Sequence, residues 1–363
     1  MRVLIIAEDL DAVGGVAQST LALAEGLQAR GHRIGLIFGN DGSLTSRWLQ
    51  VTRNLRRLGS VQLPRREPAR STVKLARAIS FSLSFRPDLV YCHSMNQLPI
   101  ATVIGRTTRK PVVMHLRTAA PIDRPRNHRR LRRVSTFMAV SQAARGEWVK
   151  FDDHVRSRCS IVPPGISLAA LHPASEEARS AARKRFGLRT DLPVLTFIGR
   201  IAEEKGIREL VVAHRQFPGL QLLVVGGEAG KEQPLTRELR LVASPMATFL
   251  GPIPDITNVY AAADAVVVPS HLETFGRVVV EGLACGLPVI AARTGGIPEI
   301  LAEQFDEYLF DKVNAKEISA KIREVMPFDN SASFRQRARA VAEKYSDTRV
   351  VDSVEKVLLW ATS

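Results

Sequence analysis

Residues 264–299 read DAVVVPSHLETFGRVVVEGLACGLPVIAARTGGIPE, and this stretch decides the fold of the chain around it. The apolar run 265–268 stops at a proline, as a buried strand does, and 287–291 is a second such run. Between the two runs we expect a loop and then a helix from about Thr274 to Gly286, because glycine favours a helix end. The order strand, helix, strand predicts one unit of a parallel sheet covered by helices.

Two glutamates bracket the predicted helix. Glu273 lies in the loop before it, and Glu281 follows eight residues later. A further helix is expected to open at 294–296, so two helix N-termini should meet at one edge of the sheet. Their N–H groups and positive dipole ends suit an anionic ligand. Carboxylates nearby suit sugar hydroxyls as hydrogen-bond acceptors. Taken singly, either acid is more simply read as a surface residue.

The combined pattern is far more specific than its parts. PS-x-x-E-x-FG-x-x-x-x-E-x-x-A-x-G-x-PV-x-A, followed by GG-x-x-E, resembles the signature of the retaining glycosyltransferases of family 4. The resemblance implies the α/β GT-B fold, in which two Rossmann-like doubly wound domains face each other across a cleft. One departure is Gly282, where the family usually has alanine. It costs about 1 kcal/mol of helix propensity and leaves the ligand chemistry unchanged.

A second motif, G-R-x-x-x-x-K-G at 199–206, follows the apolar run 194–198. At such a strand-to-helix turn, Arg200 and Lys205 can converge on one diphosphate, the first as a fork and the second as a point charge. Without further context, two solvated cations would be the simpler interpretation. The pattern resembles the diphosphate clamp of family 4.

The resemblance implies transfer of a hexose from a UDP- or GDP-linked sugar to an acceptor, with retention at the anomeric carbon. Arg200, Lys205 and helix amides around 275–278 would stabilise the leaving diphosphate. Glu273 would hold hydroxyls of the donor sugar, and Glu281 the ribose. The implied catalytic residues are His115, Arg200, Lys205 and Glu273. The implied donor-binding residues are Gly14, Gly15, Arg200, Lys205, Ile253, Glu273, Phe275, Gly276, Arg277, Val278 and Glu281.

The start of the chain also predicts a strand, a glycine loop, a helix and a strand. Gly14 and Gly15 lack the G-x-G-x-x-G spacing, so dinucleotide binding is poorly supported. Two glycines at a helix start do let a ligand approach the backbone closely. The resemblance implies that this loop reaches towards the donor phosphates.

His93 and His115 each end an apolar run, and a lone histidine there is usually structural. The segment PVVMHLR matches the position of the family's active-site histidine, so the resemblance places His115 beside the reacting sugar. Whether it also helps to move a proton stays open. His93 is more simply structural. Arg117 should lie on the same strand face as His115 and suits a phosphate, although no family pattern supports it.

Three further expectations concern local structure. We expect an amphipathic helix over 46–59, a loop-like segment over 118–133, and a loop over 248–253 that in the family lies against the nucleobase. The stiff Pro-Pro-Gly at 163–165 is a natural hinge. The predicted organisation is an acceptor-side domain (1–164), a nucleotide-sugar domain (165–345) and a helix that crosses back (346–363).

The net charge of +15 is unevenly distributed. Residues 1–160 hold 27 Lys and Arg against 11 Asp and Glu, which gives +16, and the remainder hold 24 against 25, which gives −1. This asymmetry predicts a basic face for an anionic partner, most simply a membrane with a lipid-linked or glycan acceptor. A soluble anionic acceptor and an arginine-rich composition remain alternatives. The candidate surface residues are Arg53, Arg56, Arg57, Arg65, Arg66 and those at 124–133, with Trp48 or Leu131 inserting shallowly.

No apolar run approaches the roughly 18 residues of a spanning helix, and we expect no signal peptide. The three separated cysteines favour a reducing, cytoplasmic location, with peripheral binding to the inner membrane face. No Asp-x-Asp motif is present, so we expect metal-independent polysaccharide or glycolipid synthesis without a cofactor beyond the nucleotide sugar. Two alternatives stay open, a GT-B sugar-nucleotide epimerase and a basic nucleic-acid-binding protein. The second is disfavoured because helix-turn-helix and zinc spacings are absent from the sequence.

Overall fold

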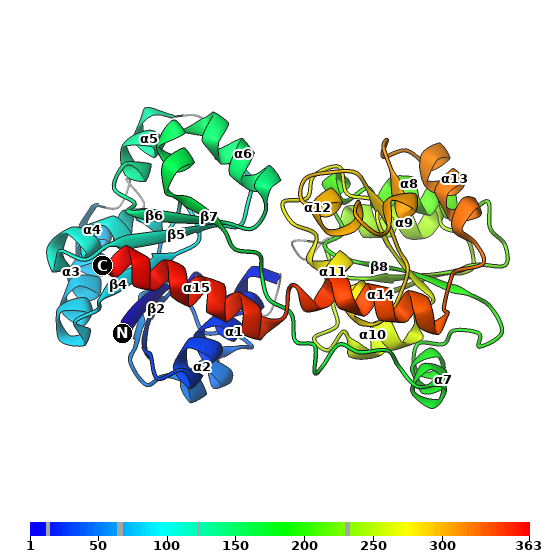
Figure 1. Cartoon of the computed structure of the whole chain (residues 1–363), viewed down its shortest axis with the longest axis horizontal. Helices are drawn as coiled ribbons and strands as arrows, with labels where there is room; N and C mark the ends of the chain where they lie inside the picture. Colours follow the sequence, from blue (N-terminus) through cyan, green and yellow to red (C-terminus); the bar gives the residue numbers. More distant parts are fainter. Residues whose placement is uncertain (12–14, 64–67, 122–123, 229–232) are drawn as a thin grey trace. The chain divides into compact units, whose positions relative to one another are not determined.

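The computed structural model describes residues 1–363 except 12–14, 64–67, 122–123 and 229–232. The described chain forms two units (Figure 1). The first unit combines Met1–Gly165 with Asp347–Ser363, and the second is Ile166–Ser346. The chain therefore passes between the units twice. The two crossings are adjacent, because Ile166 pairs with Ser346 in an isolated β-bridge.

The first unit is built on a parallel sheet with seven strands in the described chain, ordered β3-β2-β1-β4-β5-β6-β7. Its central strands are buried along nearly their whole length, which is why they appear in the sequence as continuous apolar runs. The strands are β1 (Arg2–Ile6), β2 (Arg33–Phe38), β3 (Leu55–Arg57), β4 (Leu89–Cys92), β5 (Val112–Leu116), β6 (Thr136–Ala139) and β7 (Cys159–Ile161).

Helices cover both faces of this sheet (Figure 1). One core contains Leu21 of α1, Trp48 of α2 and Val354 of α15, and the other contains Phe85 of α3 and Leu131 of α5. The helices are α1 (Gly15–Ala29), α2 (Thr45–Val51), α3 (Pro68–Phe85), α4 (Leu98–Thr108), α5 (Pro125–Leu131), α6 (Gln142–Phe151) and α15 (Asp347–Thr362), with a 3₁₀ turn η1 (Asp153–Arg158). The last helix of the chain thus belongs to the core of the first unit.

The second unit has a parallel sheet with six strands in the described residues, ordered β10-β9-β8-β11-β12-β13. Its strands are β8 (Val194–Ile198), β9 (Gln221–Val225), β10 (Ala247–Gly251), β11 (Ala265–Val268), β12 (Val289–Ala292) and β13 (Leu309–Phe310). Its helices are α7 (Glu176–Arg185), α8 (Ile207–His214), α9 (Pro234–Val242), α10 (Thr257–Ala262), α11 (Arg277–Ala284), α12 (Ile297–Leu301), α13 (Ala315–Val325) and α14 (Ala332–Glu343), with 3₁₀ turns η2 (Glu203–Lys205) and η3 (Asp306–Tyr308).

The predicted strand, helix and strand over 264–299 are confirmed as β11, α11 and β12. The helix begins at Arg277, three residues later than expected. Gly276 caps it with a φ of +104°, a backbone conformation that glycine adopts without strain, so the loop extends further than helix periodicity indicates.

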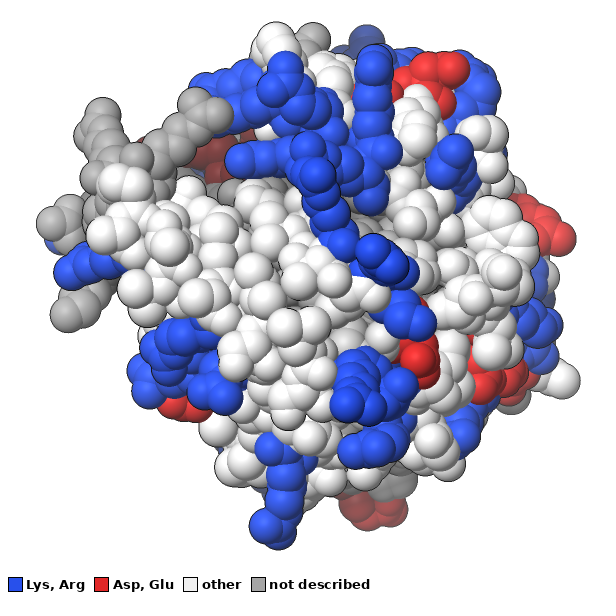
Figure 2. Space-filling view, turned by 90° about the vertical axis from the view of Figure 1, so that its left-hand side faces the viewer, with Lys and Arg blue, Asp and Glu red and all other residues white. Residues whose placement is uncertain are grey.

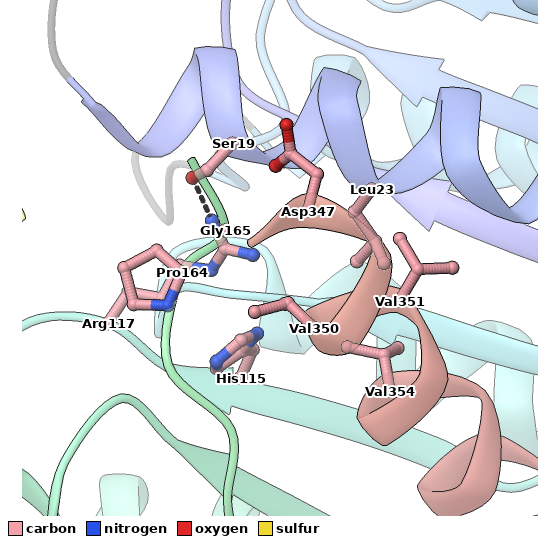
Figure 3. Close-up of a pocket in the computed structure, with 10 residues that line it drawn as sticks. All are labelled: Ser19, Leu23, His115, Arg117, Pro164, Gly165, Asp347, Val350, Val351 and Val354. Carbon is pink, nitrogen blue, oxygen red and sulfur yellow. Dashed lines mark hydrogen bonds between the residues drawn. The ribbon is translucent and has the colours of Figure 1, made fainter. Parts of the chain in front are cut away.

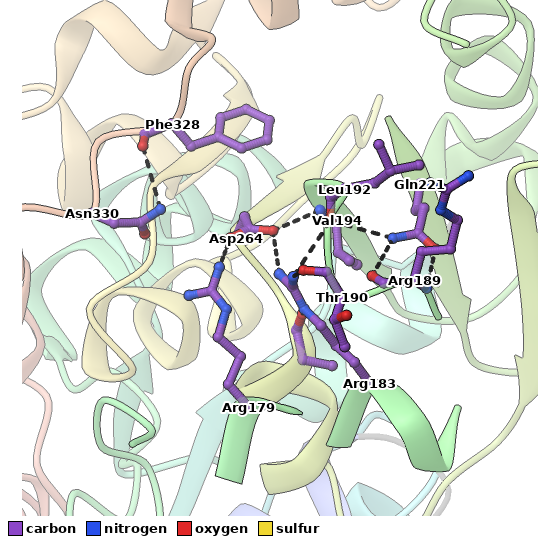
Figure 4. Close-up of polar contacts among 11 residues, drawn as sticks. Arg179, Arg183, Arg189, Thr190, Leu192, Val194, Gln221, Asp264, Phe328 and Asn330 are labelled. Atoms are coloured by element: carbon purple, nitrogen blue, oxygen red, sulfur yellow. Dashed lines mark hydrogen bonds and ion pairs between the residues drawn. The ribbon is translucent and has the colours of Figure 1, made fainter. Parts of the chain in front are cut away.

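A buried carboxylate joins β11 to α7 (Figure 4). Asp264, at the start of β11, accepts a hydrogen bond from the backbone N–H of Val194 at 2.7 Å and one from Arg183 at 2.5 Å. It also pairs with Arg179. Burial lowers the pKa of Arg183 to about 10, which leaves the guanidinium charged at neutral pH. Since Asp264 and Arg183 are buried, removal of Asp264 would leave the guanidinium of Arg183 without its counter-charge.

Three local predictions are wrong. The helix expected over 46–59 ends at Val51, and Leu55–Arg57 instead forms strand β3, which pairs with β2. The segment 118–133, expected as a loop, contains α5. The loop expected over 248–253 is largely strand β10, paired with β9. Sheet pairing decides the first and third cases, and it is invisible to local periodicity.

The described residues contain neither a helix that could span a membrane nor a cluster of metal ligands. No helix among them combines the length and apolar character needed to cross a membrane. Within the same residues, no group of three or more His, Cys, Asp and Glu side chains is arranged to hold a metal ion.

Candidate functional site

In the second unit, three loops meet where β8, β11 and β12 end. Close backbone packing at two glycines brings them together. Gly206 (φ +65°) lies so near the carbonyl of Pro269 that an added Cβ would fall 1.9 Å from the oxygen. Gly295 (φ +52°) lies even closer to the carbonyl of Glu273, where an added Cβ would fall 1.4 Å from the oxygen. Any side chain at either glycine would separate the loops that carry the predicted ligand-binding residues.

The close packing of these loops places two predicted site residues in an ion pair. Lys205 Nζ lies 2.7 Å from Glu273 Oε2, and both side chains are about one-fifth exposed. Arg200 is more exposed and donates to Glu204 at 2.7 Å. The structure therefore brings Lys205 and Glu273 together at one edge of the sheet, with Arg200 held on the same turn by a neighbouring carboxylate.

Glu281 is buried, and its carboxylate is held from two sides. Tyr260 Oη donates to Glu281 Oε2 at 2.8 Å, and Arg277 Nε donates to Oε1 at 2.6 Å. Burial and the adjacent carboxylate raise the pKa of Tyr260 well above its usual value, so the hydroxyl stays a donor. A carboxylate has about four acceptor positions, and these two bonds leave capacity for ligand hydroxyls.

The remaining predicted donor residues of this unit lie at the same sheet edge. Phe275 is buried against Tyr345, with ring centroids 5.4 Å apart, and anchors the loop before α11. Gly276 and Val278 frame the start of α11, where the first-turn amides have no acceptor within the helix. Ile253 follows β10 by two residues and packs partly on the core formed around β8 and β9.

In the first unit, Arg117 follows β5 and is buried beside the start of α1 (Figure 3). Its guanidinium donates to Ser19 Oγ and, at 3.1 Å, to Tyr91 Oη. A small cavity of about 10 Å³, room for about one water molecule, lies next to it. The lining residues are Ser19, Leu23, His115, Arg117, Pro164, Gly165, Asp347, Val350, Val351 and Val354.

His115 has no exposed surface, and both of its ring nitrogens are bonded. Nε2 lies 2.9 Å from the carbonyl oxygen of Val162, which can only accept, so Nε2 carries a proton. Burial, with a smaller effect from Arg117, lowers the pKa of His115 well below its usual value, so the ring is neutral. Nδ1 then accepts from Tyr91 Oη at 2.9 Å, and the tyrosine oxygen accepts from Arg117.

The expectation that His115 lies beside a reacting sugar stays a prediction. In this structure its side chain has no exposed surface, both ring nitrogens are bonded, and it contributes to the lining of the small cavity. The bond to Tyr91 holds that side chain next to Arg117. His93 is also held locally, by Gln97, and burial lowers its pKa to about 3. Of the predicted glycines, Gly15 begins α1, whereas Gly14 lies outside the described residues.

The two halves of the chain match two family models in succession. The model described as Glycosyltransferase Family 4 matches residues 13–170, and that described as Glycosyl transferases group 1 matches residues 178–344. Together they cover both units apart from short ends. The chain belongs to glycosyltransferase family 4. The family predicted from the sequence motifs is thereby confirmed.

Curated relatives from this family share part of the chain. The D-inositol 3-phosphate glycosyltransferase of Mycolicibacterium smegmatis is 38% identical over 208 residues, which are 55% of this chain and 46% of the relative. That of Mycobacteroides abscessus is 36% identical over 205 residues, 54% of this chain and 45% of the relative. The aligned region spans about half the length of these curated relatives.

Solved structures match the whole chain. HepE of Anabaena, crystallised with UDP and glucose, aligns with a TM-score of 0.84 and 21% identity over 98% of this chain and 99% of its own. A glycosyltransferase of Rickettsia africae aligns with a TM-score of 0.82 and 16% identity over 99% and 98%. At such identities the likeness shows the fold alone, and it confirms the predicted GT-B class.

Several side chains of this family 4 site were missed by the sequence analysis. Tyr260 was not singled out, because it precedes Glu281 by 21 residues and no spacing links them. Arg277 was expected to contribute its backbone amide, but its side chain is what holds Glu281. Ser19 and Tyr91 were also missed. Nothing in the local sequence marks them, since strand order and helix packing bring them to Arg117.

Proposed function

We propose that the chain is a retaining glycosyltransferase that moves a hexose from a UDP- or GDP-linked donor to an acceptor. The observation that carries this proposal is the contact between Lys205 and Glu273, whose loop leads into α11. A cation suits the leaving diphosphate, a carboxylate suits the hydroxyls of the sugar, and the N–H groups at the start of α11 suit the negative charge of the phosphates. Family membership and the fold support the same reading.

Departure of the nucleotide builds negative charge on the diphosphate. Lys205, Arg200 and the amides at the start of α11 stabilise that charge, so the reaction needs no metal ion in this proposal. Glu273 then accepts hydrogen bonds from hydroxyls of the donor sugar. Its contact with Lys205 holds both groups ready before the donor arrives, which reduces the reorganisation needed in the transition state.

Glu281 is proposed to bind the ribose hydroxyls. The bonds from Tyr260 and Arg277 fix the direction of its carboxylate. In the first unit, Arg117 is the residue proposed to meet the donor phosphates, and His115 is proposed to hold Tyr91 in place beside it. It lies next to Gly15 and the start of α1, at the carboxyl edge of the sheet.

The acceptor is proposed to be a glycan or a lipid-linked sugar in the assembly of a cell-surface polymer, made at the inner face of the membrane. The excess of basic residues in the first half of the chain favours an anionic acceptor. The curated relatives are named for D-inositol 3-phosphate, a small anionic molecule, which makes a soluble phosphorylated polyol the second candidate acceptor.

The test begins with thermal shifts measured for a panel of nucleotides and nucleotide sugars. A ligand present at 100 times its dissociation constant should add about 2.7 kcal/mol of stability. The donor found in this way is then incubated with acceptor candidates, and the anomeric configuration of the product is read by NMR. Inversion of the anomeric carbon would refute the retaining mechanism. Turnover of the donor without any acceptor would instead indicate an epimerase.

A further inference from the structure

The outer surface of α3, α4 and α5 is strongly basic (Figure 2). Figure 2 faces the side of the first unit where these helices lie, and blue side chains crowd its upper half. We call this region the α3–α5 surface. Eight of its exposed basic residues are Arg77, Arg86, Arg106, Arg109, Lys110, Arg129, Arg132 and Arg133.

The residues that follow the three helices form one continuous region. The strands entered after α3, α4 and α5 are β4, β5 and β6, which are neighbours in the sheet. Backbone hydrogen bonds join their starts, from Val90 N–H to the Pro111 carbonyl at 2.9 Å and from Ser135 N–H to the Val112 carbonyl at 2.9 Å. The charges that cap these helices therefore lie side by side.

Two of these arginines occupy unusual backbone positions. Arg86 follows α3 with a φ of +54°, and Arg109 follows α4 with a φ of +55°. Such left-handed helix ends are ordinarily glycine, because a side chain is disfavoured there. The helix dipole favours a cation anywhere in the last turn, so it does not account for an arginine at this position in particular. Two adjacent helices thus carry an arginine at a backbone position that disfavours any side chain. This coincidence points to a role for the positive charge.

The ion pairs found in the described chain use other basic residues of the same unit. Arg2 pairs with Asp88, and Arg30 with Glu355. Among those ion pairs, none involves the eight residues named above for the α3–α5 surface. Helix α3 contains no acidic residue, and it exposes Val73 and Leu83 by 58% and 53%. The surface therefore combines cations with apolar side chains on one helical layer.

This surface differs from the one expected from the sequence. Arg56 lies over the ring of Phe81 at 5.6 Å, and Arg57 pairs with Asp41. Arg65 and Arg66 lie outside the described residues. Trp48 and Leu131, expected to insert into a bilayer, are buried in the two cores. Of the two expected patches, the one at 124–133 remains, and it extends onto the ends of α4 and α3.

We propose that the α3–α5 surface binds the anionic lipid headgroups of a bilayer leaflet, with Val73 and Leu83 contacting the interface. Lys and Arg near such a surface are attracted to it, and apolar side chains add shallow burial. A bilayer fits better than a nucleic acid, because the large apolar residues exposed on the described parts of α3, α4 and α5 are aliphatic, and stacking on bases needs aromatic rings. The inference does not depend on the sugar-transfer reaction.

The decisive variant is R86G/R109G, tested by co-sedimentation with phosphatidylcholine vesicles that do or do not contain phosphatidylglycerol. Each lost cation should weaken binding to the anionic vesicles about fivefold, so we expect about a 25-fold loss. The unfolding temperature should hold or rise, since glycine suits both backbone positions. A loss of binding therefore cannot be attributed to a damaged fold.

The matched control is K184Q/R215Q/K312Q, which removes three exposed cations from the second unit. It should bind as the unmodified chain does, whereas R106Q/K110Q/R132Q should bind about a hundredfold more weakly. Binding to anionic vesicles should largely vanish at about 1 M salt, where the screening length is about 3 Å. Undiminished binding by R86G/R109G, an equal loss in the control, or tighter binding to single-stranded RNA than to the vesicles would each overturn the proposal.

Discussion

Lys205 and Glu273 are 68 residues apart in the sequence, yet their side chains form an ion pair of 2.7 Å at the end of the second sheet. The sequence motifs assigned them to different parts of the donor, the lysine to the diphosphate and the glutamate to the sugar. The structure shows that the two side chains are also each other's partners. Removing one therefore also changes the charge environment of the other.

Lys205→Ala and Arg200→Ala should each lower kcat by about a hundredfold or more, which is the scale of losing one preorganised donor to a developing charge. Lys312→Ala, at an exposed cation of the same unit, serves as the control and should leave kcat unchanged. The measurement is steady-state turnover with circular dichroism to confirm folding. Rates near that of the unmodified chain would remove the diphosphate clamp from the proposed mechanism.

Glu273→Gln should impair turnover strongly but should not weaken the binding of free nucleotide diphosphate. The carboxylate is assigned to the sugar, and its removal frees the Lys205 ammonium for the phosphates. Calorimetric titration with the nucleotide diphosphate and with the intact donor separates the two effects. An equal loss of affinity for both ligands would show that Glu273 is assigned to the wrong part of the donor.

Arg277→Gln should weaken nucleotide binding about tenfold, because Glu281 would lose a charge-assisted hydrogen bond that directs its carboxylate. This loss of affinity should be smaller for a nucleotide whose ribose lacks the 2′-hydroxyl. In the double variant with Glu281→Gln, the second change should add little, since both residues act on the same contact. If the losses of affinity in the two single variants add up in the double variant, Arg277 acts independently of Glu281 and is better assigned to the phosphates.

Stability of the first unit should fall as the pH drops below about 6.5, the ordinary histidine pKa. Burial lowers the pKa of His115 in the folded chain, so between these two pKa values the unfolded chain binds a proton that the folded chain does not. Stability then decreases by about 1.4 kcal/mol per pH unit for this one group. Urea titrations at several pH values give the free energy of unfolding as a function of pH. This free energy should change less steeply with pH in His115→Gln, and an unchanged pH dependence would contradict this origin.

Asp264→Asn should destabilise the second unit by about 3 kcal/mol, because it leaves the buried Arg183 without its counter-charge. The double variant with Arg183→Met should recover part of that loss, since a buried pair can be replaced by apolar groups at little cost. Thermal unfolding monitored by calorimetry provides the comparison. A double variant less stable than Asp264→Asn would show that the arginine stabilises the unit chiefly through its carbonyl contacts.

The sequence by itself determined the two parallel-sheet units and the family. Buried parallel strands appear as short apolar runs, and the glycines and acids of 264–299 have fixed spacing because one loop and one helix carry them. Arg200, Lys205 and Glu273 were predicted as site residues for the same reason, as each lies within a few residues of a recognisable strand end. Their location at the carboxyl edge followed from chain order alone.

Tertiary structure alone decided which side chains are available to a ligand and which support another residue. His115 ends an apolar strand in either case, but burial and the bonds to Tyr91 and Val162 make it a positioning residue for Arg117. Leu55 follows a helical pattern, yet pairing with β2 places it in a strand. Such outcomes depend on partners that lie tens of residues away in sequence, and local periodicity carries no information about them.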